Sequence, residues 1–333
     1  MAALTSHPLF HDGHAGFDTA LDSEQQILVR DFNAKAKAGE INFQHEPCII
    51  CGSQDGDLIS TYDRYRVWQP MILCKGCGLV RCTPRMADDI LTWFYGSDFY
   101  RKLTGGNNIL PHDRQKFMVL ANRMARRHAT ITSLVPKVRS VAEIGCGAGW
   151  NLWPFHLQGC KVVGCDYGPA LTSFGRDEMG MDLRTGSTEM LDSERFDVII
   201  LSHVLEHMPD PAAEISRLLP HLADDGIFYV EVPDARGICH GALHSAHLYY
   251  FTPTHMRALL AKCGLEAIAE HTHDGNVHFS LVARRSSTPV TIDLSMEYQR
   301  QRHAIRRIDQ RMRLKSALER LGILDLVKRL IRR

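Results

Sequence analysis

The residues with the clearest chemistry are three closely spaced glycines, Gly145, Gly147 and Gly149, which follow the mostly apolar segment 140–144. Glycine lets a backbone turn tightly and approach a ligand without a Cβ in the way. A second apolar segment ends at Asp166, about twenty residues beyond the first glycine, which is the spacing that places an acid on a ribose diol. The pattern predicts a strand, a turn and a helix that hold a nucleotide-like cofactor.

An acid, Glu143, stands before these glycines. It would repel a pyrophosphate and attract a cationic or zwitterionic ligand, so the loop matches a dinucleotide fingerprint poorly. The run E-x-G-x-G-x-G resembles the first motif of class I S-adenosylmethionine (SAM)-dependent methyltransferases, over roughly residues 136–285. The resemblance implies an α/β fold with a Rossmann-like seven-stranded sheet. It also implies that the glycine loop wraps the methionine part of SAM and that Asp166 holds the ribose hydroxyls.

The same resemblance implies further contacts with SAM. Tyr167 would form a wall beside the adenine, and Ser187 or Thr188 would bond its amine. Many relatives carry Asp where this chain has Ser187, so the adenine contact would depend partly on backbone groups. The predicted cofactor-binding residues are Glu143, Gly145, Cys146, Gly147, Gly149, Asp166, Tyr167, Ser187, Thr188, Ser202 and His203.

A second pattern consists of two copies of CxxCG, at residues 48–52 and 74–78. Four thiolates at this spacing close a tetrahedron around Zn²⁺ and leave no position for water, which is typical of a structural site. The glycine after each pair lets the backbone turn so that amides point at the sulfurs. The alternative, four buried thiols, requires the same turn twice by accident. The predicted zinc ligands are Cys48, Cys51, Cys74 and Cys77.

A zinc module, a helical segment rich in aromatic residues and a catalytic domain follow one another along the chain. This order resembles a bacterial group that includes sugar C-methyltransferases and enzymes of surface-polysaccharide and secondary-metabolite pathways. The sequence predicts an N-terminal arm (1–44), a zinc-binding module (45–85), a helical lid or connector (86–135), a SAM-binding methyltransferase domain (136–285), and a linker with a basic amphipathic C-terminal helix (286–333).

Polar residues follow the expected strand 198–201, at the sheet edge where ligands bind. Three interpretations of His203, Glu206 and His207 remain open. In the first, Glu206 and His207 brace a helix and the pocket wall. In the second, the three residues and a later histidine hold a divalent cation, as in small-RNA and quinone methyltransferases. In the third, His207 is a general base.

The later histidine is His247, in a segment that resembles the H-x-x-Y-F-S/T stretch of sugar methyltransferases. There the histidine acts as a base or a substrate ligand, and histidine titrates near neutral pH. C-methyltransferases of this group carry Glu just before the histidine and Tyr three residues before it. Ala246 and His244 replace them here, which favours an oxygen acceptor. His247 and His207 are the predicted catalytic residues, and a capping or core histidine is the alternative for His247.

The net charge of the 333 residues is +1, so bulk electrostatics predict no nucleic-acid partner. Residues 298–333 nevertheless carry 12 Lys and Arg against three acids, which leaves about −8 on the remainder. Apolar residues at helical spacing run through this tail. It could dock on the protein, pair in a homodimer, lie on an anionic membrane or grip a polyanion.

No signal peptide or membrane span is recognisable, and ten cysteines without such a signal indicate a reducing compartment. The sequence therefore predicts a cytoplasmic location, with peripheral contact at the inner membrane face as an alternative. The leading hypothesis is O-methylation of a sugar, glycan or small-molecule hydroxyl by SN2 transfer with a histidine base. The alternatives are C-methylation of a nucleotide-linked deoxysugar, RNA methylation, which the acidic remainder disfavours, and a non-catalytic cofactor-binding scaffold.

Overall fold

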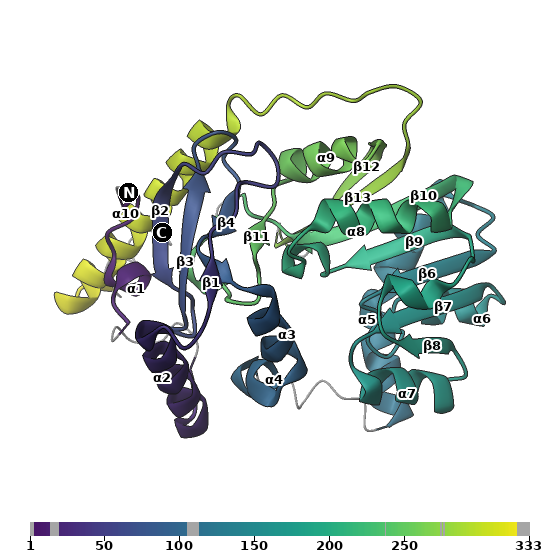
Figure 1. Ribbon diagram of the computed structural model, residues 1–333, viewed down its shortest axis with the longest axis horizontal. Helices are drawn as coiled ribbons and strands as arrows, with labels where there is room; N and C mark the ends of the chain where they lie inside the picture. Colours follow the sequence, from purple (N-terminus) through teal and green to yellow (C-terminus); the bar gives the residue numbers. More distant parts are fainter. Residues whose placement is uncertain are drawn as a thin grey trace. The chain divides into compact units, whose positions relative to one another are not determined.

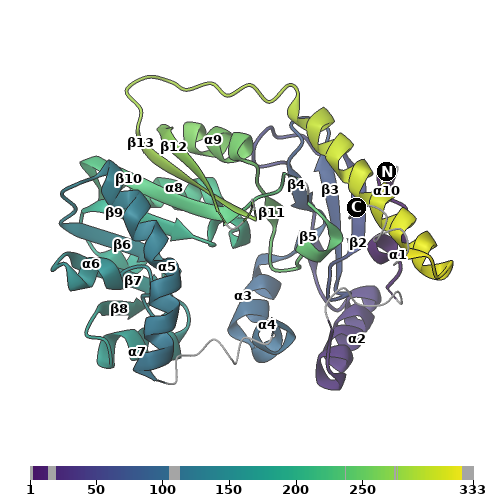
Figure 2. The same ribbon diagram turned by 180° about the vertical axis from the view of Figure 1, so that it is seen from behind.

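The computed structural model describes residues 3–13, 20–104, 113–236, 238–273, 275 and 277–324. The contacts divide the chain into two compact units that interleave along the sequence. The cysteine-rich unit contains Met1–Thr104, Ala235–Tyr250 and Asp293–Arg333, and the seven-stranded unit contains Gly105–Asp234 and Phe251–Ile292. Figures 1 and 2 show the elements of each unit from two sides.

The seven-stranded unit is built on one sheet with the strand order β12-β13-β10-β9-β6-β7-β8. The strands are β6 (Ser140–Ile144), β7 (Lys161–Asp166), β8 (Asp182–Thr185), β9 (Phe196–Ser202), β10 (Leu222–Pro233), β12 (Leu265–His273) and β13 (His278–Arg285). Strands β6 to β10 pair in parallel, and β13 is antiparallel to both β10 and β12. The predicted α/β fold with a Rossmann-like seven-stranded sheet is confirmed, and its antiparallel strands β12 and β13 follow one another in the chain. Asp274 and Asn276, between these two strands, lie outside the described residues.

Helices cover both faces of this sheet. The helices are α5 (Arg114–Leu134), α6 (Trp153–Leu157), α7 (Pro169–Asp177), α8 (Pro211–Leu218) and α9 (Pro253–Lys262), with short 3-10 turns η2 (Thr188–Leu191), η3 (Leu205–His207) and η4 (Leu219–His221). The two views show α5 and α8 on opposite faces (Figures 1 and 2). Phe117 of α5 and Phe155 of α6 pack with strand residues such as Val141 and Val198. Coverage of both faces explains why the central strands are nearly continuous apolar runs.

Two helices show how local sequence sets their ends. Thr252 caps α9 with its hydroxyl and Pro253 takes the first helical position, as the sequence predicts. Helix α8 ends at Leu218, and the 3-10 turn η4 follows it directly. Pro220 lies in that turn and lacks the amide hydrogen that an α-helix interior needs.

The cysteine-rich unit contains a four-stranded antiparallel sheet in the order β11-β4-β3-β2. Its strands are β2 (Gly56–Tyr62), β3 (Trp68–Cys74), β4 (Val80–Cys82) and β11 (Tyr249–Tyr250), and β1 (Phe43–Gln44) pairs with β5 (Arg85–Met86). The helices are α1 (Pro8–His11), α2 (Ser23–Ala38), α3 (Asp88–Gly96), α4 (Asp98–Thr104), α10 (Glu297–Arg320) and the 3-10 turn η5 (His240–Ala242). Helix α2 begins with a capping box formed by Asp22 and Gln25.

Segments distant in the sequence share the core of this unit. Leu4 and Phe10 pack with Ile59 of β2 and Ile305 of α10. The N-terminal residues that the sequence suggested as an arm therefore contribute buried side chains to the unit.

Within the described ranges, none of the helices combines the length and the hydropathy that crossing a membrane requires.

Candidate functional site

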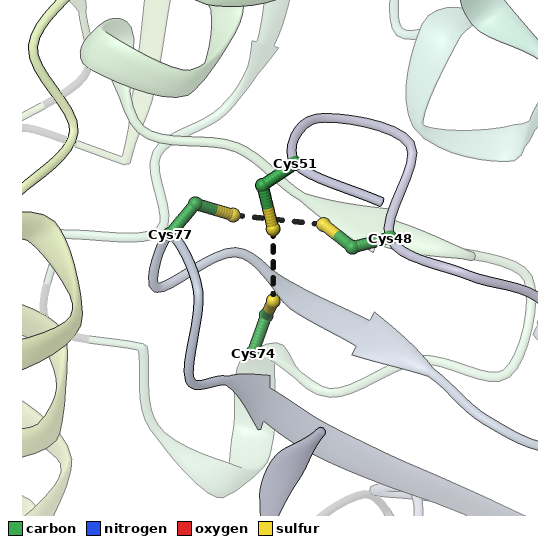
Figure 3. Close-up of side chains that lie close together, drawn as sticks. All are labelled: Cys48, Cys51, Cys74 and Cys77. Atoms are coloured by element: carbon green, nitrogen blue, oxygen red, sulfur yellow. Dashed lines mark hydrogen bonds between the residues drawn. The ribbon is translucent and has the colours of Figure 1, made fainter. Parts of the chain in front are cut away.

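The four predicted zinc ligands lie together in the cysteine-rich unit (Figure 3). The sulfurs of Cys48 and Cys77 are 3.5 Å apart, as are those of Cys51 and Cys74, and all four lie within 4.8 Å of one another. A tetrahedron with Zn–S bonds of about 2.3 Å has edges of about 3.8 Å, so the spacing suits this ion. The donor set of four thiols also fits Zn²⁺, because thiolates are the ligands of closed structural zinc sites.

Glycines shape both cysteine turns. Gly52 and Gly78 adopt positive φ angles of 74° and 78°, and their amides donate to the carbonyls of Cys48 and Cys74 at 2.8 Å. Gly76 lies inside the second pair, where a Cβ would come within 2.7 Å of the Cys51 sulfur. A glycine at 76 is therefore required for the cysteines to converge, a role that its position in the motif did not reveal.

The glycine loop follows β6 in the seven-stranded unit. Gly145 and Gly147 have φ angles of 72° and 57°, in the left-handed region that favours glycine. A Cβ on Gly145 would approach Val204 to 2.5 Å. The loop is also tied to β7, because the amides of Gly145 and Cys146 both donate to the carbonyl of Cys165. The turn predicted from the glycine spacing is thus confirmed at the carboxyl end of β6.

Asp166 ends β7 and contacts the same loop. One carboxylate oxygen accepts a hydrogen bond of 2.9 Å from the amide of Gly147, and the other accepts one of 2.7 Å from Gly168. Each oxygen of an ionised carboxylate has a second lone pair, so two hydroxyls of a ribose can still be bound. The acid and the glycines that the sequence assigned to one cofactor are therefore brought together.

Glu143 lies in β6 directly before the loop, and its side chain is 1% exposed. Asn151 donates to one carboxylate oxygen at 2.6 Å. The other oxygen, Oε2, is buried and has no hydrogen-bond partner in the described part of the chain. Burial raises the pKa of Glu143 to about 8, although the Asn151 hydrogen bond and the Arg127 charge oppose this shift. A buried carboxylate oxygen without a donor is a place for a cationic ligand group.

Behind Glu143 lies a network of charges that the sequence interpretation missed. The fully buried Glu231 of β10 accepts hydrogen bonds from Arg127 at 2.7 and 2.9 Å and from Arg126 at 2.8 Å. The Tyr229 hydroxyl donates to it at 2.7 Å, and Arg127 also donates to Asn151 at 3.0 Å. Burial alone would raise the pKa of Glu231, but His203 and the arginines hold it well below its usual range. Glu231 stands in an otherwise apolar strand run, which is the sequence signal that was available.

The residues after β9 join this network. His203 has a φ angle of 58°, unusual for a residue other than glycine, and its amide donates to the carbonyl of Glu231. Its ring nitrogens lie 3.4 Å from the carboxylates of Glu206 and Glu231. Burial lowers the pKa of His203, but these two carboxylates outweigh burial and raise it to about 9. His203 is therefore a cation at neutral pH, and it lies between two buried carboxylates.

Glu206 and His207 form the 3-10 turn η3. Glu206 is 1% exposed, and the His207 Nε2 lies 3.9 Å from its carboxylate. The predicted divalent cation at these two residues and the role of His207 as a base stay predictions.

The other predicted cofactor residues differ in exposure and bonding. Tyr167 is 75% exposed just after Asp166, as an adenine wall requires. Thr188 is buried and its hydroxyl donates to Glu214, and the amide of Ser187 donates to Glu189 at 2.8 Å. Ser202 ends β9 and is largely buried.

His247 belongs to the cysteine-rich unit, whereas His207 belongs to the seven-stranded unit. The His247 ring stacks on the His244 ring with a centroid distance of 5.2 Å, and the His247 carbonyl accepts a hydrogen bond from the Cys82 thiol. Tyr250, 5.7 Å from the His247 ring, donates its hydroxyl to the His244 carbonyl. His244, His247 and Tyr250 thus form one aromatic cluster. The role of His247 in catalysis stays a prediction.

Residues 112–270 match a protein-family model described as "Methyltransferase domain". The chain is 32% identical over 118 residues to the ubiquinone biosynthesis O-methyltransferase of Rhodopseudomonas palustris (strain TIE-1), a match that covers 33% of this chain and 46% of that protein. It is 34% identical over 102 residues to the tRNA U34 carboxymethyltransferase of Aeromonas salmonicida (strain A449), covering 28% of this chain and 31% of that protein. The chain thus spans less than half the length of either relative.

Among solved structures, the chain is similar to the Burkholderia thailandensis 1,6-didemethyltoxoflavin-N1-methyltransferase, with a TM-score of 0.48 and 19% identity. That match covers 66% of this chain and 96% of the other. The family match over residues 112–270 includes β6 to β10, the glycine loop and Asp166. Residues 112–270 of the chain therefore resemble a methyltransferase domain, and this region contains most of the seven-stranded sheet.

Proposed function

We propose that the protein transfers a methyl group from SAM to a hydroxyl of a sugar, glycan or other small molecule. The observation that carries this proposal is the buried Oε2 of Glu143, which faces no donor in the described residues although it lies beside a glycine loop. SAM carries an ammonium group, a ribose diol and a positively charged sulfur. An unpaired carboxylate, an acid at the end of β7 and a loop without Cβ atoms fit these groups.

Different residues would bind different parts of SAM. Glu143 would hold the ammonium group, Asp166 the ribose hydroxyls, and Gly145 and Gly147 the close backbone approach. Tyr167, largely exposed, would cover the adenine. Each assignment places a charged or polar protein group against a complementary group of SAM, and this agreement supports SAM over a dinucleotide.

When bound, SAM supplies a methyl group on a positively charged sulfur, and in one SN2 step a nucleophile bonds to the methyl carbon while the sulfur leaves. The protein contributes mainly alignment and the exclusion of water, because positioning provides most of the acceleration in such a reaction. A hydroxyl nucleophile must also lose its proton. His207 or His247 would accept that proton, because a neutral imidazole is a common general base.

Two observations support an oxygen atom as the methyl acceptor. Ala246 and His244 stand where C-methyltransferases of the zinc-containing group carry Glu and Tyr. In addition, one relative is named as a ubiquinone biosynthesis O-methyltransferase. The sugar or glycan acceptor rests only on the resemblance of the residues 244–253 to sugar methyltransferases.

We also propose that Cys48, Cys51, Cys74 and Cys77 bind a structural Zn²⁺. The converging sulfurs and the Gly76 position, where a Cβ would collide with Cys51, support this assignment. A closed four-thiolate site has no open position for substrate, so its role would be to hold the two cysteine turns together.

Label transfer tests the proposed reaction. The full chain would be incubated with methyl-labelled SAM and a fractionated bacterial extract, and label would be counted in the nucleotide-sugar, glycan, RNA and small-metabolite pools. Label in a sugar, glycan or small-metabolite hydroxyl supports the proposal and identifies the acceptor. Label in RNA, or a methyl group on carbon, would contradict it in favour of the corresponding alternative. SAM binding without label in any pool would favour the non-catalytic scaffold.

A further inference from the structure

Helix α10 has one buried face and one exposed face. Glu297, Gln301, Ile305 and Asp309 recur every four residues and are each at most 5% exposed. In a helix with 3.6 residues per turn, residues at this interval lie on one side. The opposite side carries residues such as Arg307, Leu314 and Leu321, which are all exposed.

Polar contacts within the cysteine-rich unit fix the buried face. The Asp309 carboxylate accepts hydrogen bonds from the amides of Ser6 at 2.9 Å and His7 at 2.8 Å. The Tyr298 hydroxyl donates to Asp57 at 2.6 Å. Because both ends of the buried face are bonded, the helix is held in one rotational orientation. Its exposed face is therefore a permanent surface of this unit.

The exposed face is strongly basic. Helix α10 contains eight Arg and Lys against three acids, and two of these acids, Glu297 and Asp309, are buried. Arg300 and Lys315 pair with acids of the same helix. Arg306, Arg307 and Arg311 are exposed and form no ion pair within the described residues. These cations raise the local positive potential without internal neutralisation.

Apolar side chains accompany the cations at the end of the helix. Leu314 is 61% exposed, Leu321 is 69% exposed and Ile323 is 38% exposed. Next to them, residues of the N-terminal segment and of α10 together line a groove of about 750 Å³. Leu9 and Leu314 line it together with Arg313 and Arg320. Aliphatic and guanidinium groups therefore share one surface, the arginine–leucine face, defined here by Arg306, Arg307, Arg311, Arg313, Leu314, Arg320 and Leu321.

We propose that the arginine–leucine face binds the surface of an anionic membrane and places the enzyme there as a peripheral protein. Basic residues attract acidic lipid headgroups, and exposed leucines gain by entering the boundary between headgroups and acyl chains. RNA would match the arginines but would leave the leucines exposed to water. A second copy of the chain would match the leucines but would bring two strongly positive faces together, which repel each other. The membrane alone suits both kinds of side chain.

Vesicle sedimentation of the full-length chain tests this proposal, and it needs no methyl-transfer activity. Phosphatidylglycerol-containing vesicles should bind the protein, whereas pure phosphatidylcholine vesicles should bind it at least about tenfold more weakly. The double variant Arg307→Glu/Arg311→Glu should lower binding at least about 25-fold, because each cation near an acidic surface contributes about fivefold. Leu314→Ser/Leu321→Ser should lower it at least about fivefold.

Lys37→Glu/Lys137→Glu reverses two exposed charges elsewhere and is the matched control, with binding expected to stay within about threefold of the wild type. Circular dichroism of every variant would establish that each is folded. Equal binding to neutral and acidic vesicles, or loss in the control as large as in the arginine variant, would overturn the proposal. So would salt-sensitive binding of RNA, or dimerisation through α10, in a protein that does not bind acidic vesicles.

Discussion

The carboxylate of Glu143 accepts a hydrogen bond of 2.6 Å from the side-chain amide of Asn151. The Asn151 oxygen in turn accepts a hydrogen bond from Arg127, which binds Glu231. The acid beside the glycine loop is thereby linked to a buried ion cluster behind it. Since Asn151 bonds only one oxygen of Glu143, the orientation of the carboxylate is fixed while its second oxygen stays available to a ligand.

The raised pKa of Glu143 predicts a pH dependence of SAM binding. Below about pH 8 the free protein holds this carboxyl protonated, and a cationic ligand group favours the ionised form. Affinity should therefore rise as the pH increases from 6 to 8 and then level. Glu143→Gln should remove this rise. The dissociation constant of SAM, measured by calorimetry from pH 6 to 9 for both proteins, checks this, because their difference cancels the titration of SAM itself. Parallel pH profiles for the two proteins would contradict the assignment.

The same group predicts how stability changes with pH. Its pKa is raised from 4.5 to about 8 on folding, so between these values the unfolded chain is ionised and the folded chain holds the proton. The free energy of unfolding should then fall as the pH rises from about 5 to 8, by at most about 1.4 kcal/mol per pH unit from this group. Urea unfolding at several pH values would measure the slope, and the slope should become shallower in Glu143→Gln.

Asp166→Ala should weaken SAM binding about 10- to 100-fold, because a hydrogen bond to a charged group contributes about 1.5–3 kcal/mol. It also removes the acceptor of the Gly147 amide, so the loop loses a contact. Calorimetric titration with SAM provides the measurement. Asp177→Ala, at an exposed acid of α7, is the matched control and should bind like the wild type. Unchanged affinity in Asp166→Ala would refute the ribose assignment.

Glu231→Gln should destabilise the seven-stranded unit by about 3–5 kcal/mol, because it leaves the charges of Arg126 and Arg127 without their buried counter-ion. Glu266→Gln removes a partly exposed partner of the exposed Arg284 and should cost less than about 1 kcal/mol. Urea denaturation of the two variants and the wild type gives the comparison. An equal decrease in the free energy of unfolding of both variants would show that the buried ion cluster stabilises the protein no more than an exposed ion pair does.

Cys74→Ser should lower the zinc content to well below one ion per chain and decrease the melting temperature, because three thiolates close a zinc site poorly. Cys239→Ser changes an exposed cysteine outside the cluster and should leave both quantities unchanged. Elemental analysis of the purified proteins together with thermal unfolding measures both effects. A Cys74→Ser protein with full zinc content would exclude the four-cysteine site.

The sequence predicted the elements whose cause is local. Thr252 and Pro253 begin α9, where capping chemistry within a few residues is sufficient. The glycine loop and the CxxCG pairs were recognisable because backbone conformation restricts those positions to glycine. The sheet followed from the apolar strand pattern together with the resemblance to methyltransferases.

What the sequence did not predict depends on side chains that meet only after folding. Arg127 lies in α5 and Glu231 lies in β10, 104 residues apart. The local sequence around either residue does not indicate that the two form an ion pair. The same is true of Ser6 and Asp309, whose contact joins residues 303 positions apart. Residues 235–250 interrupt the seven-stranded unit and return to the cysteine-rich one, which no periodicity in that segment indicates.

The bond between Asp309 and the amides of Ser6 and His7 also constrains how the protein is made. A ribosome synthesises the cysteine-rich segment early, yet Ile305 joins the core of that unit only after α10 has left the exit tunnel. The first part of the chain to be translated is therefore among the last to be completed. Until then the apolar side chains that pack against Ile305 lack this partner.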